Sequence, residues 1–157
     1  MSPLIAFPTK LPASADLEPQ AYAVYQTDFG PAATRVPFKE AHIEVERHPH
    51  KANAAREYTY WHMVTEGQPE SARITPMLDR LARVPWVRVV LENKTHVDIK
   101  FWANARGADR HFCLWHPKLN FLVVVKQTAT AYLLKTCYCP EPDRIRKLHA
   151  EYREAQR

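Results

Sequence analysis

At 157 residues, 46% of them hydrophobic, the chain can bury one sizeable core but is too short for two ordinary domains. Its net charge of +5 at pH 7 is unevenly spread: residues 1–72 carry six Lys and Arg against nine Asp and Glu, whereas residues 73–157 carry sixteen against eight, which makes the second half suited to a polyanion. The sequence has neither the apolar run of roughly 20 residues that a membrane helix needs nor the basic start of an export signal, so we expect a cytoplasmic protein.

The first part of the chain predicts little regular structure. Six of the 13 prolines lie in residues 1–37, which show no clear periodicity, so we expect an irregular Pro-rich arm that wraps on the domain or is partly disordered. Residues 38–157 then form a single α+β domain. Its first run, FKEAHIEVERH, fits a helix or, from the alternation of Ile43 and Val45, a strand.

Two helices are predicted next. Asn53 is a suitable N-cap for a helix through AAREYTYWHMVTE, and Gly67 lies where such a helix would stop. This helix places four side chains close together along one side: Tyr58, Trp61, His62 and Thr65. A second, shorter helix begins at Thr75, has Pro76 in its first position, and ends before Pro85.

From Trp86 the pattern changes from helical to extended. Five β-rich runs follow: WVRVVLE, HVDIKFW, RHFCLWH, NFLVVVK and AYLLKTCY. Because the links between them are short, neighbouring runs pair antiparallel, which predicts a four- to five-stranded antiparallel sheet with the unbroken apolar run NFLVVVK at its centre. After CPEPD, apolar residues recur at helical spacing and predict a C-terminal helix that closes the sheet: Ile145, Leu148, Tyr152 and Ala155.

The sequence offers no strong metal or cofactor signal. His48-x-His50 and Cys137-x-Cys139 together have four potential zinc ligands, but structural zinc sites usually space paired cysteines by about two to four residues. With Cys113 the cysteines are odd in number, so we expect reduced thiols. Only three glycines are present, and there is no Gly-rich phosphate loop, serine elbow or cluster of metal-binding carboxylates. We expect neither a metal nor a cofactor.

The remaining inventory of histidines, cations and aromatic residues suits the cleavage of RNA. RNA carries its own nucleophile, the 2′-hydroxyl, so a protein can cut it by supplying a base, an acid and positive charge. Histidine serves as base or acid near neutral pH, and aromatic rings hold unstacked bases. Each candidate also has a plainer interpretation: His62 as a hydrogen-bonded core residue, Arg110 as a solvated strand residue and Trp102 as core. On the run AYLLKTCY, alternation puts Thr136 on one face and Lys135 on the other.

Between roughly Tyr58 and Tyr152 the order of motifs resembles a known group of proteins. The motifs are YWHMVTEG, RITP with LDRLARVPWVRVVLEN, KFW, RHFCLW, NFLVVVK, YLLKTCY and RIRKLHAEY. They resemble phage- and prophage-encoded proteins of the barnase, EndoU, colicin and RelE-like nuclease superfamily. This resemblance implies N-terminal helices followed by an antiparallel sheet of about four strands. It also implies a metal-independent ribonuclease, in many members a toxin.

Matching residues one at a time to the resemblance gives a candidate site. His62 would act as base or acid, with Glu66 one turn on, while Arg73 and Arg110 would bind the scissile phosphate. Four residues are candidates for catalysis: His62, Arg110, Thr136 and Tyr138. Seven are candidates for binding the substrate: Glu66, Arg73, Arg88, Lys100, Trp102, Lys126 and Lys135.

The expected partners are RNA and an antitoxin or immunity protein, with no membrane partner. Two other hypotheses stay open. In the first, a non-catalytic phage or mobile-element protein binds nucleic acid or an acidic protein through its basic sheet. In the second, the protein is an effector delivered into another cell, and residues 1–37 are the remnant of a delivery or immunity-binding segment. A merely solvated basic surface explains the charge as well.

Overall fold

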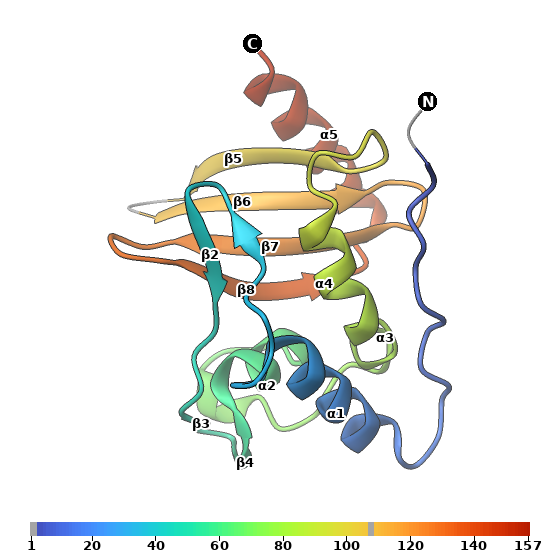
Figure 1. Ribbon diagram of the computed structural model, residues 1–157, viewed down its shortest axis with the longest axis vertical. Coiled ribbons are helices and arrows are strands. Elements are labelled where there is room, and N and C mark those ends of the chain that lie inside the picture. The colour runs from blue at the N-terminus through green and yellow to red at the C-terminus, as the bar shows by residue number, and fades with distance from the viewer. Residues whose placement is uncertain (1–2, 107–108) are drawn as a thin grey trace.

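The computed structural model describes residues 3–106 and 109–157 and has an α+β architecture (Figure 1). The helices are α1 (Leu17–Phe29), α2 (Tyr58–Val64), the short 3-10 helix η1 (Glu70–Ala72), α3 (Leu78–Ala82), α4 (Val84–Glu92) and α5 (Pro142–Ala155). The strands are β1 (Pro37–Phe38), β2 (Ala41–Glu44), β3 (Pro49–His50), β4 (Asn53–Glu57), β5 (Lys100–Arg106), β6 (Asp109–His116), β7 (Phe121–Gln127) and β8 (Tyr132–Tyr138). Within the described residues, no helix is long and apolar enough to cross a membrane.

The main sheet has six strands in the order β1-β2-β8-β7-β6-β5, and β3 and β4 form a separate hairpin. Strands β5 to β8 are an antiparallel meander, as the short links predict. The prediction of a wholly antiparallel sheet is wrong for one pair of strands. Strand β2 pairs parallel with β8, with Ile43 beside Tyr132 and Glu44 beside Leu133. Strand β2 lies far from β8 in sequence, so no short turn sets its direction.

The run WVRVVLE is a helix, which corrects its prediction as a strand. It lies in α4, whose buried residues recur at three- and four-residue steps: Val84, Val87, Val90 and Leu91. The β-branched valines favour a strand locally, but a short apolar run does not separate a strand from a buried helix. Helix α4 contacts β6 and β7 on one side and α1 on another, so tertiary burial decides its structure.

The segment before α2 is also partly extended. The run FKEAHIEVERH, left open between helix and strand, contains strand β2. The helix predicted from Asn53 begins only at Tyr58, because residues 53–57 form β4 and pair with β3. The Asn53 side chain accepts a hydrogen bond from the Ala55 N–H at 3.1 Å, which holds a turn rather than a helix N-terminus.

Helix α1 lies inside the segment predicted as an irregular arm. Its buried residues, at four-residue steps, are Leu17, Ala21, Tyr25 and Phe29. The chain before it is also held in place: the Leu11 N–H donates to the Ala82 carbonyl at 2.9 Å, and the indole of Trp86 donates to the Pro8 carbonyl at 2.7 Å. Figure 1 shows this N-terminal stretch passing alongside α3 and α4.

Helices cover both faces of the meander. The larger core lies between the sheet and helices α1, α2 and α4. The second core lies under α5 and consists of Trp102, Cys113, Trp115, Leu122, Val124 and Leu148. Residues 121–125 of β7 are all buried, which confirms the prediction of a central strand, and α5 confirms the predicted C-terminal helix.

Candidate functional site

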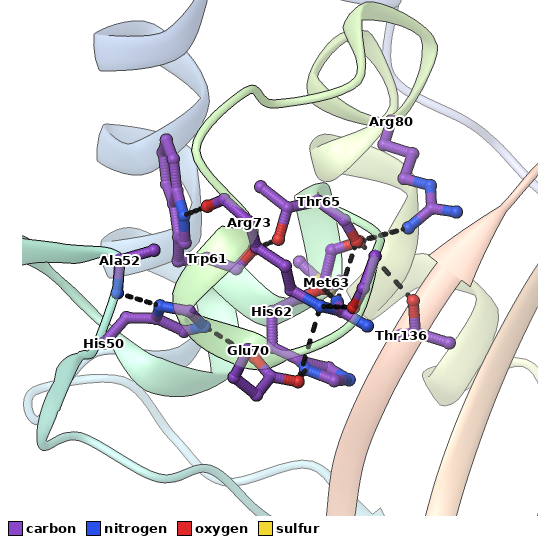
Figure 2. Close-up of polar contacts among 11 residues, drawn as sticks. His50, Ala52, Trp61, His62, Met63, Thr65, Glu70, Arg73, Arg80 and Thr136 are labelled. Carbon is purple, nitrogen blue, oxygen red and sulfur yellow. Dashed lines mark hydrogen bonds and ion pairs between the residues drawn. The ribbon is translucent and has the colours of Figure 1, made fainter.

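A pocket of about 230 Å³ opens where α2 meets strand β8. It is lined by Glu46, Tyr58, Thr59, His62, Lys126, Leu133, Leu134 and Lys135. Strand β2 pairs with β8 at the first two residues of β8 only. Further along β8, helix α2 packs beside it in place of a strand. There the Thr136 hydroxyl donates to the Met63 carbonyl at 3.5 Å, a contact drawn in Figure 2. The pocket therefore forms where a helix replaces a neighbouring strand.

Strand β8 contains an irregularity at Lys135, which lines the pocket. Thr136 lies opposite Val124 and Leu134 lies opposite Val125, so Lys135 is an extra residue in the ladder. Its Nζ lies 3.0 Å from His111 Nε2. His111 pairs with Lys126 across β6 and β7, so the three side chains share one face of the sheet. Leu133 lies opposite Lys126, and Lys135, two residues further on, stays on that face. The extra residue turns Thr136 onto the same face, opposite Val124, which corrects the alternation that put Thr136 and Lys135 on opposite faces.

Behind the pocket, one carboxylate joins two histidines (Figure 2). Glu70 Oε1 lies 2.7 Å from His62 Nδ1, and Glu70 Oε2 lies 2.7 Å from His50 Nε2. The guanidinium of Arg73 lies 3.4 Å from Oε1. Burial acts to raise the pKa of Glu70, but the hydrogen bond from His50 and the contacts with His62 and Arg73 outweigh it, so the pKa lies below its ordinary value of 4.5. Glu70 is therefore a carboxylate at neutral pH.

This arrangement sets the state of His62. An ionised carboxylate only accepts hydrogen bonds, so Nδ1 carries the imidazole proton and Nε2 keeps its lone pair on a side chain that lines the pocket. Burial lowers the pKa of His62 below its ordinary value of 6.5, the charges of Arg73 and Lys135 act in the same direction, and Glu70 opposes them. At neutral pH the ring is neutral, and Nε2 is able to accept a proton.

The lowered pKa of His62 predicts a pH-dependent stability. The unfolded chain binds a proton at this position more readily than the folded protein does, so the contribution of neutral His62 is present above about pH 6.5 and is lost as the pH falls. We expect the free energy of unfolding to decrease between about pH 7.5 and 5.5, and to decrease less steeply in His62→Gln. Urea unfolding at both pH values measures this. Burial also lowers the pKa of His116, so part of the slope remains, but equal slopes in the two proteins would contradict the prediction.

Two arginines close the C-terminal end of α2. Arg73 is only 9% exposed and donates to the carbonyls of His62 at 2.9 Å, Thr65 at 3.0 Å and Gly67 at 2.9 Å. Arg80 donates to the Thr65 carbonyl at 2.8 Å. A helix C-terminus leaves such carbonyls without intrahelical partners, and these arginines satisfy them. The guanidinium of Arg73 is thus bound to backbone carbonyls, and its positive charge acts on the neighbouring Glu70 and His62.

Other predicted site residues lie outside the pocket. Arg110 lies on β6 with its guanidinium 5.1 Å from the centre of the Phe112 ring, on the face opposite His111. The hydroxyl of Tyr138 accepts a hydrogen bond from Arg144 at 3.0 Å. The structure therefore brings His62 together with Lys126 and Lys135, and does not bring Arg110 or Tyr138 to them.

The more distant predicted residues have structural contacts. Glu66 is exposed and pairs with Arg80 at 3.0 Å. Arg88 donates to the carbonyls of Asp28 and Thr34, each at 2.7 Å, and so ties α4 to the end of α1. Lys100 and Trp102 both contact Tyr152 of α5: the Lys100 Nζ lies 4.9 Å from the centre of its ring, and Trp102 packs edge-on against it.

Sequence reasoning missed two residues that shape the site. Glu70 lies in the link QPES, which has no periodicity and reads as a loop. His50 was considered only as a zinc ligand, whereas it binds Glu70, and Cys137 lies in the core. Two histidines upstream of an acidic link were the available signal, but sequence alone does not show that they converge on it. No disulfide joins the three cysteines.

The described residues contain no group of three or more His, Cys, Asp or Glu side chains arranged to hold a metal ion. No protein-family model matches the chain, and no curated protein sequence or solved structure matches it at a significant level. Its function is therefore inferred from the pocket and from the state of His62.

Proposed function

We propose that the protein cleaves single-stranded RNA without a metal, with His62 as the general base. The observation that carries this proposal is the Glu70–His62 pair, at 2.7 Å, behind a pocket that two lysines also line. The likeness to the barnase, EndoU, colicin and RelE-like nucleases is part of the proposal and agrees with this chemistry. An antitoxin or immunity partner and a cytoplasmic location remain predictions that depend on it.

The chemistry requires no nucleophile from the protein. His62 Nε2 accepts the proton of the 2′-hydroxyl, the 2′ oxygen forms a bond to phosphorus, and the bond to the 5′ oxygen breaks. The leaving 5′ oxygen takes up a proton from water, and the products are a 2′,3′-cyclic phosphate and a 5′-hydroxyl. The protonated His62 then releases its proton to the solvent, which regenerates the base. Negative charge builds up on the phosphoryl oxygens during this step, and the ammonium groups of Lys126 and Lys135, two residues that line the pocket, stabilise it.

The pocket favours an unpaired strand. Its volume of about 230 Å³ lies below the roughly 300–1,000 Å³ of pockets that hold drug-sized ligands. Leu133, Leu134 and the ring of Tyr58 give it apolar walls. One unstacked nucleotide suits such a site, whereas a duplex holds its bases inside the helix.

Lys135→Gln, compared with Arg110→Gln, tests this proposal. Each substitution removes one positive charge, but only Lys135 lines the pocket. We expect Lys135→Gln to slow cleavage about 100-fold, as the loss of a group that stabilises transition-state charge does, and Arg110→Gln to slow it much less. The assay is cleavage of a labelled single-stranded oligonucleotide in excess EDTA, with the cyclic phosphate identified by mass spectrometry.

The same assay separates catalysis from binding alone. If the protein binds RNA with a steep salt dependence but yields no cut product, the non-catalytic hypothesis is correct and His62 is not a base. If Arg110→Gln causes the larger loss, Arg110 binds the phosphate, as the sequence resemblance implies, and the contact lies on the face of the sheet opposite His111. Equal and small losses for both variants would reject the pocket as the site of reaction.

A further inference from the structure

His50 is a buried histidine that does not line the pocket. It lies in β3 and is 1% exposed. Its Nδ1 accepts the N–H of Ala52 at 2.9 Å, and a backbone amide only donates. The imidazole proton therefore resides on Nε2, which donates to Glu70 Oε2 at 2.7 Å. The backbone of the β3–β4 hairpin thus fixes which ring nitrogen of His50 faces the carboxylate.

We propose that His50 is a positioning residue that orients His62 through Glu70. Each oxygen of the carboxylate binds one histidine, and Figure 2 shows the two rings on either side of it. With Oε2 held by His50, the carboxylate does not rotate, and Oε1 stays directed at His62 Nδ1. The His62 proton then stays on Nδ1, and Nε2 remains the acceptor. The effect on cleavage rests on the proposed function, whereas the effect on the His62 proton does not.

Glu70 requires such support because of where it lies. It belongs to η1, a three-residue 3-10 helix in the link between α2 and α3. A side chain with several rotatable bonds on so short an element is not oriented by the backbone alone. Arg73 contacts Oε1 at 3.4 Å, but its guanidinium is directed mainly at carbonyl oxygens. Of the described contacts, only the one with His50 holds Oε2 at hydrogen-bond distance.

A purely structural role for His50 makes different predictions. Its ring also stacks on Tyr58, with centroids 5.1 Å apart, so it could serve only to attach the hairpin to α2. The ring of His48 packs tilted against the same tyrosine, with centroids 5.0 Å apart, and His48 is exposed. His48 is therefore a matched control: it directly precedes β3, has an aromatic contact with Tyr58 and, among the described residues, has no hydrogen bond to Glu70.

The experiment compares the imidazole nitrogens of His62 in four proteins by long-range 1H–15N correlation spectra. His50→Phe keeps a ring against Tyr58 but removes the N–H, His50→Gln keeps an N–H donor near the same position, and His48→Phe is the control. We expect the His62 proton to reside on Nδ1 in the unmodified protein, in His50→Gln and in His48→Phe, and to be shared between the two nitrogens in His50→Phe. For RNA cleavage we expect kcat to fall about tenfold in His50→Phe, with KM unchanged and with recovery in His50→Gln.

An unchanged Nδ1–H signal for His62 in folded His50→Phe overturns the inference, even if the protein cuts RNA. If the signal changes as expected but no protein cuts RNA, the proposed function fails and the link from His50 to His62 stands. Should His50→Phe not fold, His50→Asn replaces it, because its shorter amide does not reach Glu70. An unchanged His62 signal in that variant overturns the inference in the same way.

Discussion

Replacing His62 with glutamine is expected to slow the cleavage of single-stranded RNA by about 10³-fold at neutral pH, the middle of the range for the loss of a general base. Glutamine keeps a polar side chain beside Glu70 but has no lone pair that accepts a proton at this pH. The loss should appear in kcat, because the two lysines proposed to contact the phosphate remain in the pocket. Single-turnover cleavage of a labelled oligonucleotide in EDTA measures it.

His42→Gln is the matched control for this variant. His42 is an exposed histidine on β2, outside the pocket, so its replacement should leave the rate within about twofold. Circular dichroism at pH 7.5 should be the same for all three proteins. If the cleavage rate of His62→Gln is within tenfold of that of the unmodified protein, His62 is not the base. An activity that is equal in all three preparations comes from a contaminating nuclease.

Arg73→Met is expected to lower the free energy of unfolding by about 3 kcal/mol. The substitution removes the Arg73 donor from the carbonyls of His62 and Gly67 in a largely buried position and leaves the Thr65 carbonyl with Arg80 alone. It also removes the positive charge beside Glu70. Urea unfolding at pH 7.5 measures the change.

An exposed ion pair provides the comparison for Arg73. Arg35 contacts Glu44 at 2.8 Å with its side chain 66% exposed, and Arg35→Met should change the free energy of unfolding by less than about 1 kcal/mol. Similar changes in the two variants would show that Arg73 does not hold the end of α2. The variant also bears on the phosphate role that the sequence suggested: a raised KM in folded Arg73→Met would support that role.

The sequence predicted those parts of the fold whose signals are local. The meander follows from short links between β-rich runs, and α5 follows from apolar residues at helical spacing. Strand β2 was harder, because its parallel pairing with β8 joins residues about 90 positions apart and no turn specifies it. Helix α4 was misread because Val87 and Val90 favour strands until they are buried between the sheet and α1.

The candidate site was predicted in part. His62, Lys126 and Lys135 were chosen for their chemistry, and the structure places them in one pocket. Glu70 could not be found, because nothing in a short polar link indicates that it meets two histidines. Thr136 shares the face of Lys135 only because of a bulge, and a single extra residue in a ladder leaves no mark on the hydrophobic pattern.

The boundary between the less basic and the more basic part of the chain also divides the proposed site. The less basic part, residues 1–72, supplies His62, the proposed general base, and its carboxylate Glu70, and residues 73–157 supply Lys126 and Lys135. The elements around the pocket are divided in the same way, because β2 and α2 belong to the first part and their neighbour β8 belongs to the second. A cut after residue 72 would therefore leave neither fragment with all four of these side chains.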